Sequence, residues 1–343
     1  MTKETIFMLF NLPEIPNSKL YIEEMTPEQM AIDKCSTGQR LTEADILTLK
    51  ESIDFYKLVF QKLKEIDLSS ITKYQVEELK IYLKSVFNFV LTISNNIHFE
   101  LLFRVSFVRE SFLEKGKVRN PSFLGYPPLD LVKEKGVYNR ANSNEKTAFY
   151  ASFYENVALR ETKPAKGENI IISIWKNISG KPFSSYPISN SSVKNRGVQE
   201  ATLALNKSKE TNHPLFAEIM DLVLGFLASE FVKDGEIKSP FKYEYLYSAF
   251  FADQILSPRI ENEMIPDTDF IIYPSVAWKH EQENVVLPPV VVNKKLKLIK
   301  AIEYFVEETF YEKNLLKDEM PAKLKFIREA TWFEPNLIIW EDE

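Results

Sequence analysis

The residues best suited to chemistry are an arginine, a tyrosine and a glutamate in the stretch Tyr138 to Glu161. Tyr150 follows Arg140 by ten residues, and Glu161 follows Tyr150 by eleven. A strand ending at Tyr150 and a helix running to Glu161 would bring the three side chains to one cleft, because helix residues three or four apart share a face. A guanidinium, an aromatic ring and a carboxylate around one cavity suit a bound dinucleotide. They also suit an ordinary ion pair at a strand–helix junction, which the spacing alone favours.

Several common catalytic constellations are absent from the sequence. There is no Gly-x-Gly-x-x-Gly fingerprint, no phosphate-binding loop ending in Gly-Lys-Ser/Thr, no His-Glu-x-x-His and no Gly-x-Ser-x-Gly, and only 9 of the 343 residues are glycine. The single cysteine, Cys35, and three scattered histidines offer no ligand set, so no metal site is expected. An active site must therefore be built from Arg, Tyr, Glu, Ser and Asn.

Net charge and hydropathy limit the partners and the cellular location that we expect for the protein. The net charge of −6 provides no general attraction to nucleic acid or to an anionic membrane, so neither is an expected partner. The apolar run Ile6–Phe10 is too short for a signal peptide, and no stretch approaches the ~20 apolar residues of a membrane span. One cysteine excludes an internal disulfide and fits a reducing cytosol. We therefore expect a soluble cytoplasmic protein.

The first third of the chain is expected to be mostly helical. Residues 1–40 are proline-containing and are predicted to be irregular. Apolar residues then recur with alternating spacings of three and four, which predicts the helices Ile46–Leu63 and Val76–Ile97. Capping boxes are expected before each helix, at Thr42–Asp45 and Thr72–Gln75. The short linker predicts an antiparallel hairpin, whose apolar seams form a core or a dimer interface.

From His98 onwards, short apolar runs alternate with helical ones. Strands are predicted at Phe99–Phe107, Thr147–Tyr150, Asn169–Trp175, Asp269–Tyr273 and Val285–Val292. Helices are predicted over the run ending at Glu161, Leu215–Phe231, Tyr243–Leu256 and Lys294–Tyr311. Arg119–Pro128 is a predicted loop, and the polar segment Ser179–Gly197 is a candidate flexible lid or insertion. The tail Ala322–Trp340 is predicted to be a short β-hairpin or strand pair.

Six short motifs, taken in order, resemble a known family. They are Arg104, Asn139–Asn142 (NRAN), Phe149–Ser152 (FYAS), Ala158–Glu161 (A-x-x-E), Tyr273–Ser275 (YPS) and Asn284. Their types, order and spacing are similar to those of the RES domain, which is named for its Arg, Glu and Ser. That family resembles the diphtheria-toxin-like ADP-ribosyltransferases in fold, and its characterised members degrade NAD as toxins of bacterial toxin–antitoxin modules. The similarity extends from Phe99 to Leu298.

The resemblance implies an α+β fold, with an ADP-ribosyltransferase-like mixed β core preceded by the helical hairpin. Three parts are expected: residues 1–97 with the irregular segment and the hairpin, residues 98–312 as the RES-like domain, and residues 313–343 as a C-terminal extension packing on it. An insertion near 176–240 is expected, because 113 residues separate the glutamate and the serine that match the family.

The resemblance also assigns roles to seven side chains. The catalytic ones would be Glu161, Arg140 and Ser275, and those binding NAD would be Arg104, Tyr150, Asn142 and Asn284. Glu161 would accept a hydrogen bond from the ribose 2′-hydroxyl and stabilise an oxocarbenium-like transition state. The two arginines would hold the phosphates, Tyr150 would stack on the nicotinamide, and Ser275 would orient Glu161 or bind the ribose. Asn139 and Asn144 stand where the family usually has glycine.

The implied reaction is cleavage of NAD at the nicotinamide–ribose bond by a glycohydrolase toxin that depletes NAD and arrests growth. NAD would be the substrate, and no prosthetic cofactor is expected. Two alternatives remain open, a mono-ADP-ribosyltransferase that modifies a macromolecule and a catalytically silent RES-like binding or assembly module. The implied partners are an Xre-like antitoxin and a second copy in a homodimer.

Overall fold

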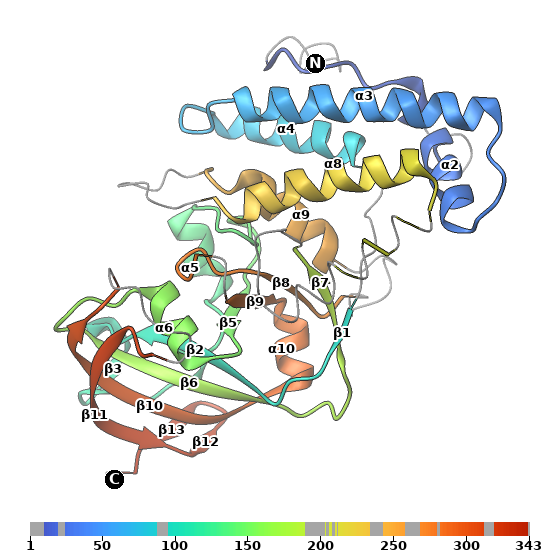
Figure 1. Cartoon of the computed structure of the whole chain (residues 1–343). Helices are drawn as coiled ribbons and strands as arrows, with labels where there is room; N and C mark the ends of the chain where they lie inside the picture. Colours follow the sequence, from blue (N-terminus) through green and yellow to red (C-terminus); the bar gives the residue numbers. More distant parts are fainter. Residues whose placement is uncertain are drawn as a thin grey trace.

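A layer of helices lies against one side of a large β-sheet, with the C-terminus at the opposite side of the molecule (Figure 1). The structure is a computed structural model that describes residues 10–19, 25–87, 95–188, 203, 206–207, 210, 212–233, 243–257, 268–279, 282–311 and 319–341. The expected α+β class is confirmed, with the sheet mostly antiparallel. Within the described ranges, no helix combines the length and the apolar character that crossing a membrane requires.

The described strands form one nine-stranded sheet in which only the pair β7–β8 is parallel. In spatial order the strands are β1 (Asn95–Ile97), β7 (Phe183–Pro187), β8 (Phe270–Pro274), β9 (Glu283–Leu287), β5 (Phe149–Ser152), β2 (Leu101–Phe107), β6 (Asn169–Asn177), β10 (Leu296–Thr309) and β11 (Ala322–Ala330). Two small pairs lie outside it: β3 (Leu113–Glu114) with β4 (Lys117–Val118), and β12 (Trp332–Glu334) with β13 (Leu337–Ile339).

The helical layer contains the predicted hairpin. Its helices are α2 (Pro27–Ser36), α3 (Glu43–Glu65), α4 (Lys73–Val86), α8 (Pro214–Phe231) and α9 (Leu246–Leu256). The helices α3 and α4 run antiparallel (Figure 1), and both predicted capping boxes are present. The second predicted helix is too long, because α4 ends at Val86 and Ile97 lies in β1; residues 88–94 lie outside the described part.

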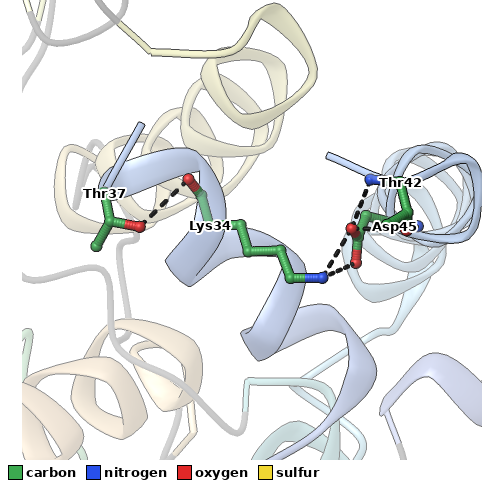
Figure 2. A network of polar contacts seen from close by, with 4 residues as sticks. All are labelled: Lys34, Thr37, Thr42 and Asp45. Carbon is green, nitrogen blue, oxygen red and sulfur yellow. Dashed lines mark hydrogen bonds and ion pairs between the residues drawn. The ribbon is translucent and has the colours of Figure 1, made fainter. Parts of the chain in front are cut away.

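Helix α2 was not predicted, because residues 1–40 were expected to be irregular. Its local signals are present in the sequence: Thr26 and Gln29 form a capping box around Pro27 at the first turn. The helix is tied to α3 by Lys34, whose Nζ lies 2.8 Å from both carboxylate oxygens of Asp45 (Figure 2). Asp45 also accepts a hydrogen bond from the backbone N–H of Thr42, so one carboxylate both caps α3 and holds α2.

The largest error of the sequence interpretation is the helix predicted over Lys294–Tyr311, because most of this range, Leu296–Thr309, forms strand β10. The buried positions include Leu298, Ala301, Glu303 and Val306, in steps of three, two and three. Such steps resemble a helical stripe, but they arise because register irregularities interrupt the alternation of the strand. Pairing with β6 on one side and β11 on the other decides the outcome.

The neighbouring strand prediction Val285–Val292 is right only in its first half. The strand β9 ends at Leu287, and Pro289 then opens helix α10 (Pro289–Lys295). Proline suits the first turn of a helix because it has no N–H to leave unsatisfied there. The helix therefore includes three consecutive valines, whose intrinsic preference is for strands.

Most other elements lie close to where they were expected. The strands β2, β6 and β8 and the helices α8 and α9 lie within three residues of their predicted bounds, and the tail forms β11 and the β12–β13 hairpin. Strand β5 begins and ends two residues later than predicted. The candidate lid Ser179–Gly197 contains β7, which lies inside the main sheet, and residues 189–197 fall outside the described ranges. Single 3-10 turns occupy Asn17–Lys19, Glu110–Phe112 and Pro121–Leu124.

Candidate active site

A pocket of about 330 Å³ opens where the centre of the sheet meets helix α6 (Glu155–Thr162) and the start of α9. Five of the seven expected site residues line it together: Arg104, Arg140, Tyr150, Glu161 and Asn284. They come from β2, the loop before β5, β5 itself, α6 and β9, so separate parts of the chain converge on one cavity. The remaining two, Ser275 and Asn142, lie directly behind lining residues, as described below.

Glu161 is held by the turn that follows β8. The hydroxyl of Ser275 donates to Oε1 of Glu161, and the N–H of Ala277 donates to the same oxygen at 3.4 Å. Ser275 is fully buried and also accepts a hydrogen bond from the N–H of Trp278 at 3.2 Å. Ser275 therefore orients the carboxylate from behind, and the second oxygen, Oε2, makes no hydrogen bond to any described residue. One oxygen is fixed and the other is available to a ligand.

The ring of Tyr150 is fixed through its hydroxyl. The hydroxyl accepts from the N–H of Ala141 at 3.0 Å and donates to Oδ1 of Asn142 at 2.8 Å. The Asn142 amide nitrogen donates to the carbonyls of Ser143 and Lys146, at 3.0 Å each, and only 5% of the residue is exposed. Asn142 thus positions Tyr150 instead of lining the pocket. Burial raises the pKa of Tyr150 well above its usual value, so the hydroxyl stays neutral at physiological pH.

Arg104 points into the pocket from the centre of β2. Its Nη1 donates to the carbonyl of Tyr150 at 2.7 Å, and its guanidinium carbon lies 5.4 Å from the ring centroid of Phe149. The Nε atom is buried and has no hydrogen-bond partner among the described residues. Burial lowers the pKa of Arg104 to about 10, which leaves it charged at neutral pH. A partly buried, charged guanidinium that lines a pocket is a favourable site for an anion.

Arg140 is anchored on its far side by the end of helix α8. Its Nη1 donates to the carbonyl of Phe231 and its Nη2 to the carbonyl of Lys233, the latter at 2.9 Å. Its guanidinium carbon lies 5.0 Å from the ring centroid of Tyr245. Both terminal nitrogens are thus partly used, so the expected two-pronged grip of Arg140 on a phosphate would compete with these bonds to the end of α8.

The loop carrying Arg140 does not need the glycines of the family. Asn139 and Asn142 exchange backbone hydrogen bonds of 2.9 and 3.4 Å across a tight turn. The residues with positive φ in the described chain include neither Asn139 nor Asn144. Both asparagines adopt backbone conformations open to any L-residue, so replacing glycine there imposes no strain on the turn.

Two tyrosines to which the sequence interpretation assigned no role also line the pocket. Tyr245 stands immediately before α9, and Tyr273 lies on β8 with 5% of its surface exposed. Burial, and next the charge of Glu161, raises the pKa of Tyr273 well above its usual value. Tyr273 is the first residue of the Tyr273–Ser275 motif and could have been assigned to the site on that basis, whereas no local pattern marks Tyr245. Opposite Tyr273, Asn284 on β9 has a buried amide nitrogen with no partner in the described part of the chain.

A second pocket of about 330 Å³ adjoins the first and shares Arg104, Val105 and Thr162 with it. Its other lining residues include two further cations, Arg109 and Lys135, and aromatic rings such as Tyr126. Together the two pockets offer cationic and aromatic groups on both sides of Arg104. They suit an extended, anionic ligand with flat rings better than a small neutral one.

Comparison of the chain with protein-family models, with curated proteins and with solved structures finds no match in any of the three. Within the described ranges, no group of three or more His, Cys, Asp or Glu side chains is placed to hold a metal ion. The kind of ligand that the pocket can bind is therefore inferred from its geometry and charges alone.

Proposed function

We propose that this chain is a RES-type NAD glycohydrolase with an ADP-ribosyltransferase-like fold, which hydrolyses NAD at its nicotinamide–ribose bond. The main support is the convergence of Arg104, Arg140, Tyr150, Glu161 and Asn284 on one pocket. These residues are distant in sequence and match a single family pattern. An ordinary structural ion pair of Glu161 would not require a hydrogen bond from the buried Ser275 hydroxyl to its carboxylate, which this structure contains.

The chemistry follows from the charges around the pocket. As nicotinamide leaves, positive charge develops on the anomeric carbon and ring oxygen of the ribose. Oε2 of Glu161 would accept from the ribose hydroxyl and stabilise that charge, while the guanidinium of Arg104 holds a phosphate. The aromatic ring of Tyr150 would face the nicotinamide. Water then adds to the anomeric carbon, so that NAD and water yield ADP-ribose, nicotinamide and one proton.

The direct test is incubation of the purified full-length chain with NAD, with nicotinamide and ADP-ribose quantified by chromatography. Wild type should release both in equal amounts, and Glu161→Gln should lower the rate by at least about 100-fold, since it removes the charge. Glu168→Gln is the matched control, because Glu168 is an exposed carboxylate outside the pocket. Absence of release by wild type, or equal release by Glu161→Gln, would contradict the proposal.

The fate of the ribosyl group separates the alternatives. Label retained on a macromolecule would indicate a mono-ADP-ribosyltransferase, and no release would indicate a silent module. In a bacterial cell, the proposal predicts a cytoplasmic toxin whose expression lowers NAD and arrests growth, with both effects abolished by Arg140→Ala. An Xre-like antitoxin and a homodimer are part of the same proposal, and co-purification and mass measurement test them.

A further inference from the structure

Helix α8 links the N-terminal hairpin to the pocket. In Figure 1, α8 and α9 lie between the α3–α4 hairpin and the sheet. Near the middle of α8, Phe226 stacks on Phe60 of α3 with ring centroids 4.4 Å apart and an interplanar angle of 10°. On α9, Tyr247 lies 5.9 Å from the same Phe226 ring, and its hydroxyl donates to the carbonyl of Leu63 near the end of α3 at 2.9 Å. Helix α3 therefore contacts both α8, through Phe226, and the first turn of α9, through Tyr247.

The C-terminal end of α8 contacts two pocket residues, Arg140 and Tyr273. The last carbonyls of a helix have no partners within it and carry partial negative charge, which makes them good acceptors for arginine. Arg140 occupies this position by donating to the carbonyls of Phe231 and Lys233. The ring of Phe231 also packs against pocket residue Tyr273, with centroids 5.8 Å apart. The C-terminal end of α8 thus holds one pocket residue by hydrogen bonds and another by ring contact.

We propose that the helical hairpin is a positioning element of the active site, acting on Arg140 through α8. Phe226 and Tyr247 are positioning residues: neither lines the pocket, and both set where the carbonyls of Phe231 and Lys233 lie. The hairpin thereby controls the activity and is more than an appended domain. The inference depends on the proposed function for its kinetic readout, but the physical link to Arg140 can be measured without turnover.

The kinetic test is a double-mutant cycle between Phe226→Leu and Arg140→Lys, which keeps the positive charge but cannot donate in the same way to the carbonyls of both Phe231 and Lys233. Phe226→Leu alone should lower kcat/KM for nicotinamide release about tenfold, since small misplacements of site residues have effects of this size. In the Arg140→Lys background it should have no further effect on the remaining activity, because its action passes through the anchored guanidinium. Independent, additive effects would overturn the inference. Tyr247→Phe, which removes only the hydrogen bond to Leu63, is the milder variant should Phe226→Leu fail to fold.

The matched control is Phe183→Leu. Phe183 is fully buried and packs against Phe99 and Phe270, in a core cluster separate from that of α8. Phe183→Leu makes the same change of side chain as Phe226→Leu, but in a core cluster that does not include the helices α3, α8 and α9. We therefore expect kcat/KM of Phe183→Leu to stay within about twofold of wild type. A tenfold loss in this control would show that any core defect lowers activity, and would overturn the inference.

Hydrogen exchange gives a readout that is independent of catalysis. A peptide covering residues 138–148 should exchange faster in Phe226→Leu and Tyr247→Phe than in wild type or Phe183→Leu, because the anchor of Arg140 is loosened. Unchanged exchange in both variants would overturn the inference. If wild type releases no nicotinamide, the proposed function fails while exchange still decides whether the hairpin acts on this loop.

Discussion

Ser275→Ala isolates the contribution of orientation to the proposed reaction. The substitution removes the hydroxyl that donates to Oε1 of Glu161 and leaves only the longer bond from the Ala277 N–H, at 3.4 Å. A hydrogen bond to a charged group contributes about 1.5–3 kcal/mol. Loss of that amount from the transition state alone lowers kcat by about 10- to 150-fold. Because Ser275 is fully buried and does not line the pocket, KM should change by less than about threefold.

Steady-state nicotinamide release over a range of NAD concentrations separates the two parameters. Ser152→Ala is the control: Ser152 is equally buried, and its hydroxyl donates to the carbonyl of Glu283 at 2.9 Å, away from Glu161. Both variants should lose about 1–3 kcal/mol of stability in urea unfolding, since each removes a buried hydroxyl that donates one hydrogen bond and accepts another. Only Ser275→Ala should lose kcat. A kcat within twofold of wild type would refute the orienting role, and a rise in KM alone would indicate direct contact with substrate.

Three further predictions concern charge and burial. Arg104→Lys should raise KM for NAD about 10- to 100-fold in the same assay, because lysine cannot reproduce the paired donors of a guanidinium; an unchanged KM would place the phosphates elsewhere. Lys19→Met should cost about 3–5 kcal/mol in urea unfolding, because it leaves Glu28 as a buried and unpaired carboxylate, and adding Glu28→Leu should recover most of it. Burial raises the pKa of Tyr186 far above ~10, so its contribution to stability is complete below that pH and falls above it. Tyr186→Phe should therefore flatten the alkaline loss of stability by up to about 1.4 kcal/mol per pH unit, measured between about pH 9 and 11.

Local signals in the sequence identified α3, α4, α6, α8 and α9 and most of the strands. Capping depends on residues three apart, so Thr42 with Asp45 and Thr72 with Gln75 could be recognised without any knowledge of the fold. The same signal at Thr26 and Gln29 would have found α2. The order of Arg, Glu and Ser motifs likewise named the residues of the candidate site, because residue type and order are properties of the chain itself.

Long-range contacts decided the rest. Spacing could not tell that Lys294–Tyr311 is a strand, because the irregularities that shift its buried positions exist only when β6 and β11 pair with it. The sequence also could not decide whether Ser275 orients Glu161 or binds the ribose, or show that Asn142 holds Tyr150, since burial and hydrogen-bond direction arise on packing. The contact of Arg140 with the end of α8 joins residues 91 positions apart. The sequence alone predicted which side chains would meet at the pocket. Tertiary packing decided which of them face the ligand and which hold the others in place.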